Sequence, residues 1–144
     1  MSLKDGSKKM SKSELSDFSR INLTDNKDQI INKIKKAKTD PLPMPKSIEE
    51  LDKRLEAKNL IGIYASLTNL TLEKSVESFV GKNFSEFKKK LSVALIDKIE
   101  PISIEIKKLL DDQSYLDKIL LDGVEKASLI AFKKIKRIKE IVGF

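Results

Sequence analysis

The sequence of 144 residues contains no cysteine, no histidine and no tryptophan. Without cysteine the chain forms no disulfide and no thiolate metal site, and it carries no cysteine nucleophile. It also has no apolar run near the ~20 residues that a bilayer-spanning helix needs. Lys4, Asp5, Lys8 and Lys9 leave no apolar core for a signal peptide near the N-terminus. These absences predict a soluble, cytoplasmic protein with no protein-bound metal and no membrane partner.

The length and charge of the chain set further bounds. At 40% apolar residues, with only four prolines and five glycines, the chain suits one domain that buries about two thirds of its unfolded surface. The net charge of +7 gathers at both ends: residues 1–46 hold 11 Lys/Arg against 6 Asp/Glu, and residues 133–144 hold 5 against 1. Basic ends favour phosphate binding with salt-dependent affinity. The alternative is that lysine-rich helices only keep a small domain soluble.

Apolar residues recur at helical spacing over most of the chain, which predicts an all-α fold with a helical bundle in its later part. We expect helices over 25–38, after Ser47, over 59–67, from Asn69 or Thr71 to a stop at Gly81, from Phe84 onward, and after a cap at Ser114. Residues 21–23 are the only credible strand. The alternating prolines of 40–45 break helical structure, and they predict either a semi-rigid spacer or a surface loop.

Several local features refine this expectation. Thr24 or Asp25 should cap the first helix, which should bury Ile30, Ile31, Ile34 and Ala37, with Lys33 mostly outside that stripe. Ser47 with Glu50, and Asn83 with Glu86, have capping-box spacing. The long run after Asn83 should form a buried seam through Ile99 and Leu109, with a kink or two abutting helices at Pro101. Gly123 should mark a close contact between helices.

Aromatic side chains divide into two groups. Core packing is expected for Tyr64, Phe79, Phe84 and Phe87. Tyr115 and Phe132 are the candidates for stacking on unpaired nucleotide bases.

The segment Ser7–Lys8–Lys9–Met10–Ser11–Lys12–Ser13 is the most informative in the chain. Its last five residues spell KMSKS, the signature loop of class I aminoacyl-tRNA synthetases. Two ammonium groups on a short, serine-rich segment can close over a bound ATP and neutralise charge on the leaving pyrophosphate. Taken alone, the same residues could be a solvated basic tail.

Further segments continue the pattern to the end of the chain, and together they resemble the bacterial tryptophanyl-tRNA synthetase family. These segments are residues 19–25, 33–40, 59–65, 81–88, 100–102 and 121–127. The family's nucleotide-binding half, with its HIGH-type motif and tryptophan pocket, has no counterpart here, since the chain has no histidine. The resemblance therefore implies a C-terminal part of such an enzyme, with the KMSKS loop and end of the catalytic domain at 1–24, a connecting helix and proline-rich linker at 25–46, and an anticodon-binding-like helical domain at 47–144.

The resemblance also implies roles for particular residues. Lys9 and Lys12 would be catalytic and steady the departing pyrophosphate of ATP, which enters with Mg²⁺. Met10 and Ser11 would shape the hinge, and Ser13 would donate to a phosphate or start the next turn. The other implied partners are tRNA(Trp) and the missing N-terminal half. The basic cluster near the C-terminus is a candidate tRNA contact, namely Lys133, Lys134, Lys136 and Arg137.

Two alternatives stay open from the sequence. A tyrosyl-type synthetase shares the loop chemistry, although its bacterial members usually carry a further RNA-binding domain. A non-catalytic basic helical module that binds RNA or protein would keep the charge pattern but give no reason for KMSKS. The resemblance implies that the full enzyme is a homodimer whose main contact lies in the absent half. We therefore expect the fragment to be monomeric, and we expect it to be inactive alone.

Overall fold

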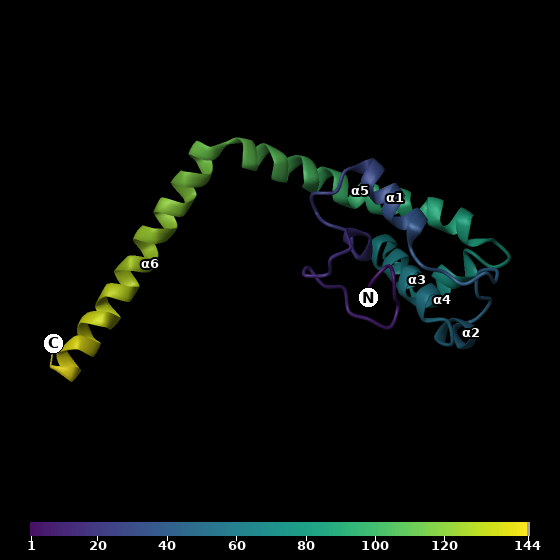
Figure 1. Cartoon of the computed structure of the whole chain (residues 1–144), viewed down its shortest axis with the longest axis horizontal. Coiled ribbons are helices and arrows are strands. Elements are labelled where there is room, and N and C mark those ends of the chain that lie inside the picture. Colours follow the sequence, from purple (N-terminus) through teal and green to yellow (C-terminus); the bar gives the residue numbers. More distant parts are fainter. Residues whose placement is uncertain (144) are drawn as a thin grey trace. The chain divides into compact units, whose positions relative to one another are not determined.

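The computed structural model describes residues 1–143, and within that range it is helical with no strand (Figure 1). This confirms the predicted all-α class. The described elements are a 3-10 helix η1 (Asp17–Ser19) and α-helices α1 (Lys27–Lys36), α2 (Ile48–Asp52), α3 (Leu55–Thr68), α4 (Leu72–Glu77), α5 (Phe84–Asp111) and α6 (Gln113–Val142). The chain divides into two compact units, residues 1–104 and 105–144.

Helix α1 begins two residues later than the sequence analysis expected. Asn26 is its cap: the Asn26 side chain accepts from the Gln29 amide, and the Gln29 side chain accepts from the Asn26 amide. This reciprocal pair satisfies two free amides of the first turn. The predicted caps Thr24 and Asp25 are therefore wrong, because Asp25 is buried and bound to Lys33.

The buried face of α1 also differs from the predicted stripe. Ile30, Lys33 and Ile34 are buried, whereas Ile31 is 40% exposed. Lys33 lies three residues after Ile30 and one before Ile34, so the helical repeat places it on the buried side. The prediction that Lys33 lies outside the stripe is wrong.

Residues 21–23 form no strand. The Asp25 amide donates to the Asn22 carbonyl, and the Asn22 amide donates to the Asp25 carboxylate. These local bonds make a turn, so no neighbouring chain is needed to satisfy the backbone groups.

The proline-rich segment is packed into the first unit. Met44 is 1% exposed, and its amide donates to the Lys82 carbonyl. Arg54 fixes the segment by donating to both oxygens of Asp40 and to the Pro43 carbonyl. Burial alone would raise the pKa of Asp40, but the bonds from Arg54 and the Leu42 amide outweigh it and leave that pKa below its ordinary value.

Helices α2 to α4 contribute buried residues to the core. Ser47 caps α2 by accepting from the Glu50 amide, while the Glu50 side chain accepts from the Lys46 amide rather than from Ser47. Thr71 caps α4. Asn69 instead ends α3 in a left-handed conformation, with φ of 56°. Gly81, at φ of 76°, completes the turn before α5.

The N-terminal part of α5 completes the core. Asn83 and Glu86 form the predicted capping box. Tyr64, Phe79 and Phe87 pack edge to face, with ring centroids 4.8 to 6.0 Å apart, and Phe84 joins them. Such contacts contribute about 0.5–1.5 kcal/mol per pair beyond area burial. The predicted core role of these four aromatics is confirmed.

The later part of α5 departs from the prediction. The predicted seam is buried through Leu95, but Ile102 and Leu109 are 44% and 43% exposed. Helix α5 continues through Pro101, so two abutting helices are not formed, while a kink there stays a prediction. Pro101 is exposed. The helix therefore continues because water can solvate the carbonyl that proline leaves without a donor.

Helix α6 starts at a different cap from the one expected. Asp112 accepts from the Tyr115 amide, and Ser114 only donates its hydroxyl to Asp112. Within the described residues, a Cβ built at Gly123 would meet nothing within 4 Å, so the structure shows no close contact at this glycine. No residue of α6 is buried. No helix among residues 1–143 is long and apolar enough to cross a membrane.

Candidate functional site

The KMSKS loop is part of the first unit, and a backbone hydrogen bond fixes the chain on each side of it. On its near side, the Ser2 amide donates to the Lys8 carbonyl over 2.8 Å. On its far side, the Ser19 amide donates to the Ser16 carbonyl over 3.1 Å, within the turn of η1. We call residues 9–15, between these points, the signature segment.

Leu3 ties the far end of this region to the body of the unit. Its amide donates to the Ser19 carbonyl over 2.9 Å, and its carbonyl accepts from the Lys38 amide over 2.8 Å. The Leu3 side chain is 2% exposed within the core. A single buried residue therefore joins the exit of the loop to the end of α1.

Gly6 allows the N-terminal stretch to lie directly on α3. A Cβ at this position would come within 2.8 Å of the carbonyl carbon and oxygen of Leu55. Real Cβ contacts are never that short, so only glycine fits this approach. On the same stretch, the Asn59 side chain donates to the Ser2 carbonyl over 3.0 Å.

The predicted site residues Lys9, Met10, Ser11, Lys12 and Ser13 all lie in the signature segment. Four of them are exposed, and Met10 is partly exposed. Ser13 is bound to Ser11, hydroxyl to hydroxyl at 3.0 Å and amide to hydroxyl at 3.3 Å. Within residues 1–143, neither Lys9 nor Lys12 forms an ion pair. Both ammonium groups can therefore meet an anion without breaking a bond first.

Arg20 lies beneath the signature segment. Its Nη1 donates to the Ser11 carbonyl at 3.3 Å and to the Glu14 carbonyl at 3.0 Å. Its Nε donates to the Asn22 side chain, and its Nη2 lies 3.2 Å from Asp17. All three guanidinium nitrogens are thus engaged, and the side chain is only 18% exposed.

A buried lysine holds this arrangement to α1. The Lys33 ammonium donates to both oxygens of Asp25, at 2.7 and 2.9 Å, and pairs with Asp17 at 2.6 Å. The hydrogen bond from Lys33, followed by the one from Asn22, lowers the pKa of Asp17 below its ordinary value. We call Asp17, Arg20, Asn22, Asp25 and Lys33 the support cluster. It places fixed charge and fixed donors under the segment that carries the two catalytic candidates.

The support cluster was not predicted from the sequence. A usable signal was present, since Lys33 has the same helical spacing as the buried Ile30, Ile34 and Ala37. A lysine at such a position needs an acidic partner, and Asp25 and Asp17 precede it in the chain.

The predicted tRNA contacts lie in the second unit. Lys133, Lys134, Lys136 and Arg137 are exposed on the C-terminal part of α6. Phe132, beside them, is 71% exposed, and Tyr115 near the start of the helix is 47% exposed. Basic side chains near a helix C-terminus are also stabilised by the helix dipole.

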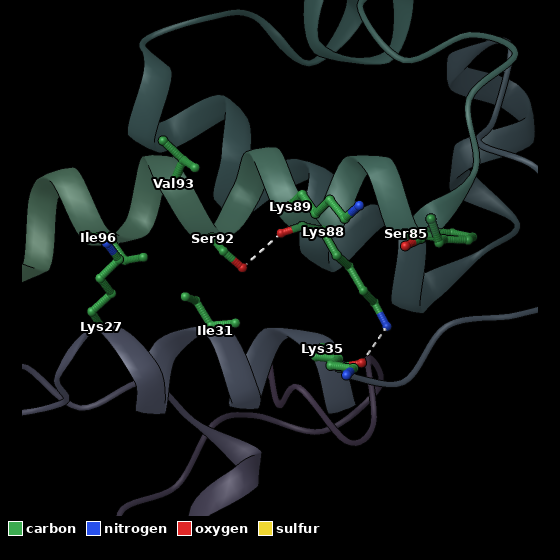
Figure 2. Close-up of a pocket in the computed structure, with 10 residues that line it drawn as sticks. Lys27, Ile31, Lys35, Ser85, Lys88, Lys89, Ser92, Val93 and Ile96 are labelled. Atoms are coloured by element: carbon green, nitrogen blue, oxygen red, sulfur yellow. Dashed lines mark hydrogen bonds between the residues drawn. The ribbon is translucent and has the colours of Figure 1, made fainter.

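A groove of about 570 Å³ lies between α1 and α5 (Figure 2). Ile31 of α1 faces Ser92 and Ile96 of α5 across it, and lysines from both helices stand around it. Lys88 bridges one end by donating to the carbonyls of Lys35 and Ala37, and burial lowers its pKa. Ile31, which was predicted to lie in the core, is 40% exposed and lines this groove.

The family of this chain follows from residues 1–99, which match the model described as tRNA synthetases class I (W and Y). The chain belongs to that family. At full length it is 49% identical to the tryptophan--tRNA ligase of Agrobacterium fabrum and 46% identical to that of Rickettsia felis. Over 99% of the chain it is 46% identical to the tryptophan--tRNA ligase of Mesorhizobium japonicum.

The same comparisons show that the chain is shorter than its relatives. It spans 41%, 43% and 40% of the lengths of these three ligases, respectively. Among solved structures, the tryptophanyl-tRNA synthetase of Mycoplasma pneumoniae has a similar fold, with a TM-score of 0.70 at 22% identity. That alignment covers the whole of this chain and 43% of the other.

Proposed function

We propose that the chain is the C-terminal part of a tryptophan--tRNA ligase and supplies its KMSKS loop and tRNA-binding helices. The observation that carries this proposal is a KMSKS sequence whose two lysines stand exposed and unpaired, within residues 1–143, on a loop held at both ends. Identity of 44–49% to tryptophan--tRNA ligases over the chain's full length favours tryptophan over tyrosine. Membership of the synthetase family argues against an unrelated basic module.

The proposed reaction has two steps. The tryptophan carboxylate attacks the α-phosphate of ATP, which forms tryptophanyl adenylate and releases pyrophosphate, and the tryptophanyl group then passes to the 3′ end of tRNA(Trp). ATP arrives with Mg²⁺ as a substrate complex. During the first step negative charge grows on the β- and γ-phosphates as the bond to the α-phosphate breaks. Lys9 and Lys12 stabilise that charge most when it is largest, which lowers the barrier rather than only binding ATP.

The chain alone is proposed to be inactive, because the groups that hold adenine, ribose and tryptophan belong to the part of the relatives that it does not span. We expect no tryptophan-dependent exchange of labelled pyrophosphate into ATP by residues 1–144. A hybrid enzyme should recover exchange if these residues replace the matching C-terminal segment of the Agrobacterium fabrum ligase. Exchange by the chain alone would contradict the proposed incompleteness, and an inactive, correctly folded hybrid would contradict the proposed function.

The basic end of α6 is proposed to contact tRNA(Trp). We expect replacement of Lys133, Lys134, Lys136 and Arg137 by glutamine to weaken binding of the hybrid to tRNA(Trp), as measured by filter binding across a salt series. Each lost phosphate contact should make the negative slope of log K against log salt shallower by roughly 0.7–0.9.

A matched control tests whether this effect is local. Lys53, Lys74, Lys90 and Lys98 are also exposed, and their replacement by glutamine makes the same change in net charge. We expect the slope to change much less in this control. Equal slopes in the two variants would mean that only overall charge matters, and would remove the assignment to α6. A non-cognate tRNA separates cognate recognition from general attraction in both variants.

A further inference from the structure

We propose that Arg20 is a positioning residue for the KMSKS loop, which it holds by the backbone of the signature segment. This inference rests on the proposed function, since it concerns the same loop.

Arg20 supplies the hydrogen bonds between the signature segment and the rest of the first unit. Among the hydrogen bonds within residues 1–143, the other bonds made by residues 9–15 join Ser11 to Ser13. The bonds to the Ser11 and Glu14 carbonyls come from one nitrogen, Nη1 of Arg20. The position of the segment therefore depends on where this guanidinium is held.

The guanidinium of Arg20 is itself fixed by its neighbours. Asn22 and Asp17 bind its other two nitrogens, and Asn22 also donates to Asp17 over 2.8 Å. Asp17 in turn is held by Lys33, which is 4% exposed on α1. A planar fork with fixed donors orients two carbonyls at once, which a lysine ammonium cannot do with the same geometry.

Arg20 contacts backbone carbonyls and leaves the side chains of Lys9 and Lys12 free. Ser11 immediately precedes Lys12, so the bonded carbonyl belongs to the peptide unit from which Lys12 extends. Holding this peptide places the Lys12 ammonium in a limited volume without neutralising it. Such preorganisation lowers the entropic cost of closing the loop over a ligand.

Arg54 provides a matched control within the same unit. It also donates to a carboxylate and to backbone carbonyls of an irregular segment, Pro43 and Leu42, and its side chain is 9% exposed. Its contacts lie in the proline-rich segment and at Glu50 and Phe84, and none lies in the loop. Loss of Arg54 should therefore affect stability without a specific effect on the signature segment.

The first experiment measures order in the loop of the 144-residue chain and does not depend on catalysis. The chain has no cysteine, so Leu15→Cys, at a fully exposed position beside Glu14, gives a single attachment site for a nitroxide spin label. We expect Arg20→Gln to narrow the paramagnetic resonance lines at this position, Arg20→Lys to narrow them partly, and Arg54→Gln to leave them unchanged. A label at Ser66→Cys on α3 should report no change in any variant.

The second experiment measures catalysis in the hybrid enzyme by pyrophosphate exchange. We expect Arg20→Gln to lower kcat about 10- to 100-fold, since small misplacements of catalytic groups have effects of that order. The KM for tryptophan should stay within twofold, and Arg20→Lys should recover part of the loss. Arg54→Gln should change kcat less than threefold, even if it lowers the melting temperature as much as Arg20→Gln does.

Three outcomes would overturn the inference: unchanged nitroxide lines in Arg20→Gln, a kcat within twofold of the unsubstituted hybrid, or an equal loss of kcat in Arg54→Gln. An inactive unsubstituted hybrid would instead contradict the proposed function. In that case the spin-label result still decides whether Arg20 holds the segment.

Discussion

Replacement of Lys9 or Lys12 by alanine in the hybrid enzyme is expected to slow pyrophosphate exchange about 10²- to 10³-fold. Removal of one well-aimed donor to a developing oxyanion typically has an effect of that size, equivalent to about 3–4 kcal/mol. Both ammonium groups are exposed and, within residues 1–143, without a carboxylate partner, so neither substitution breaks a contact that supports the fold. The loss should therefore appear in kcat, with an unchanged melting temperature.

The double variant and a neighbouring lysine complete this test. Since Lys9 and Lys12 are proposed to act on the same departing group, the double variant should lose less than the product of the two single losses. Lys8 is equally basic but precedes the motif and pairs with Asp5 at 3.6 Å. We expect Lys8→Ala to retain exchange within about threefold. Exchange by the double variant at the unsubstituted rate would contradict the role assigned to the loop.

The second large effect is expected on stability. Lys33→Met removes the ammonium that binds both oxygens of Asp25, and Asp25 is 3% exposed. Breaking a buried pair on one side typically costs about 3–5 kcal/mol, because the remaining charge is left without compensation. Small domains are stable by about 5–15 kcal/mol, so this loss is a large share of the total. Urea unfolding followed by circular dichroism measures it.

Two further variants separate this mechanism from a general effect of losing a lysine. Lys35→Met changes an exposed lysine two residues along α1 and should cost less than about 1 kcal/mol. Asp25→Asn combined with Lys33→Met removes both charges and should recover part of the stability, or of soluble expression if the single variant does not fold. Equal stability of Lys33→Met and Lys35→Met would contradict the proposed role of the buried pair.

The all-α fold and the loop were predictable because both depend on local patterns. The capping box at Asn83 and Glu86 needs only the correct spacing of two side chains, and the structure forms it. The core aromatics followed from their places in apolar stripes. KMSKS is a contiguous pattern, so its location needed no tertiary information.

The errors arise where a distant partner decides the role of a residue. Asp25 has the chemistry of a helix cap, but Lys33, eight residues later, binds it and Asn26 becomes the cap instead. Arg20 looks like one of many basic residues until the fold brings the Ser11 and Glu14 carbonyls to it. Helix α6 has the apolar periodicity of a buried helix, yet none of its residues is buried. Periodicity identifies a face but not what covers it.

The anchors on either side of the loop also set how far it can travel. Lys8 is fixed through Ser2, and Ser16 through the turn to Ser19, whose carbonyl is bound to Leu3 in the core. The stretch between Lys8 and Ser16 extends to about 28 Å when fully drawn out, at roughly 3.5 Å per residue. Its midpoint therefore reaches at most about 14 Å from the line that joins the two anchors. Any triphosphate served by Lys9 and Lys12 must lie within that radius plus the length of a lysine side chain.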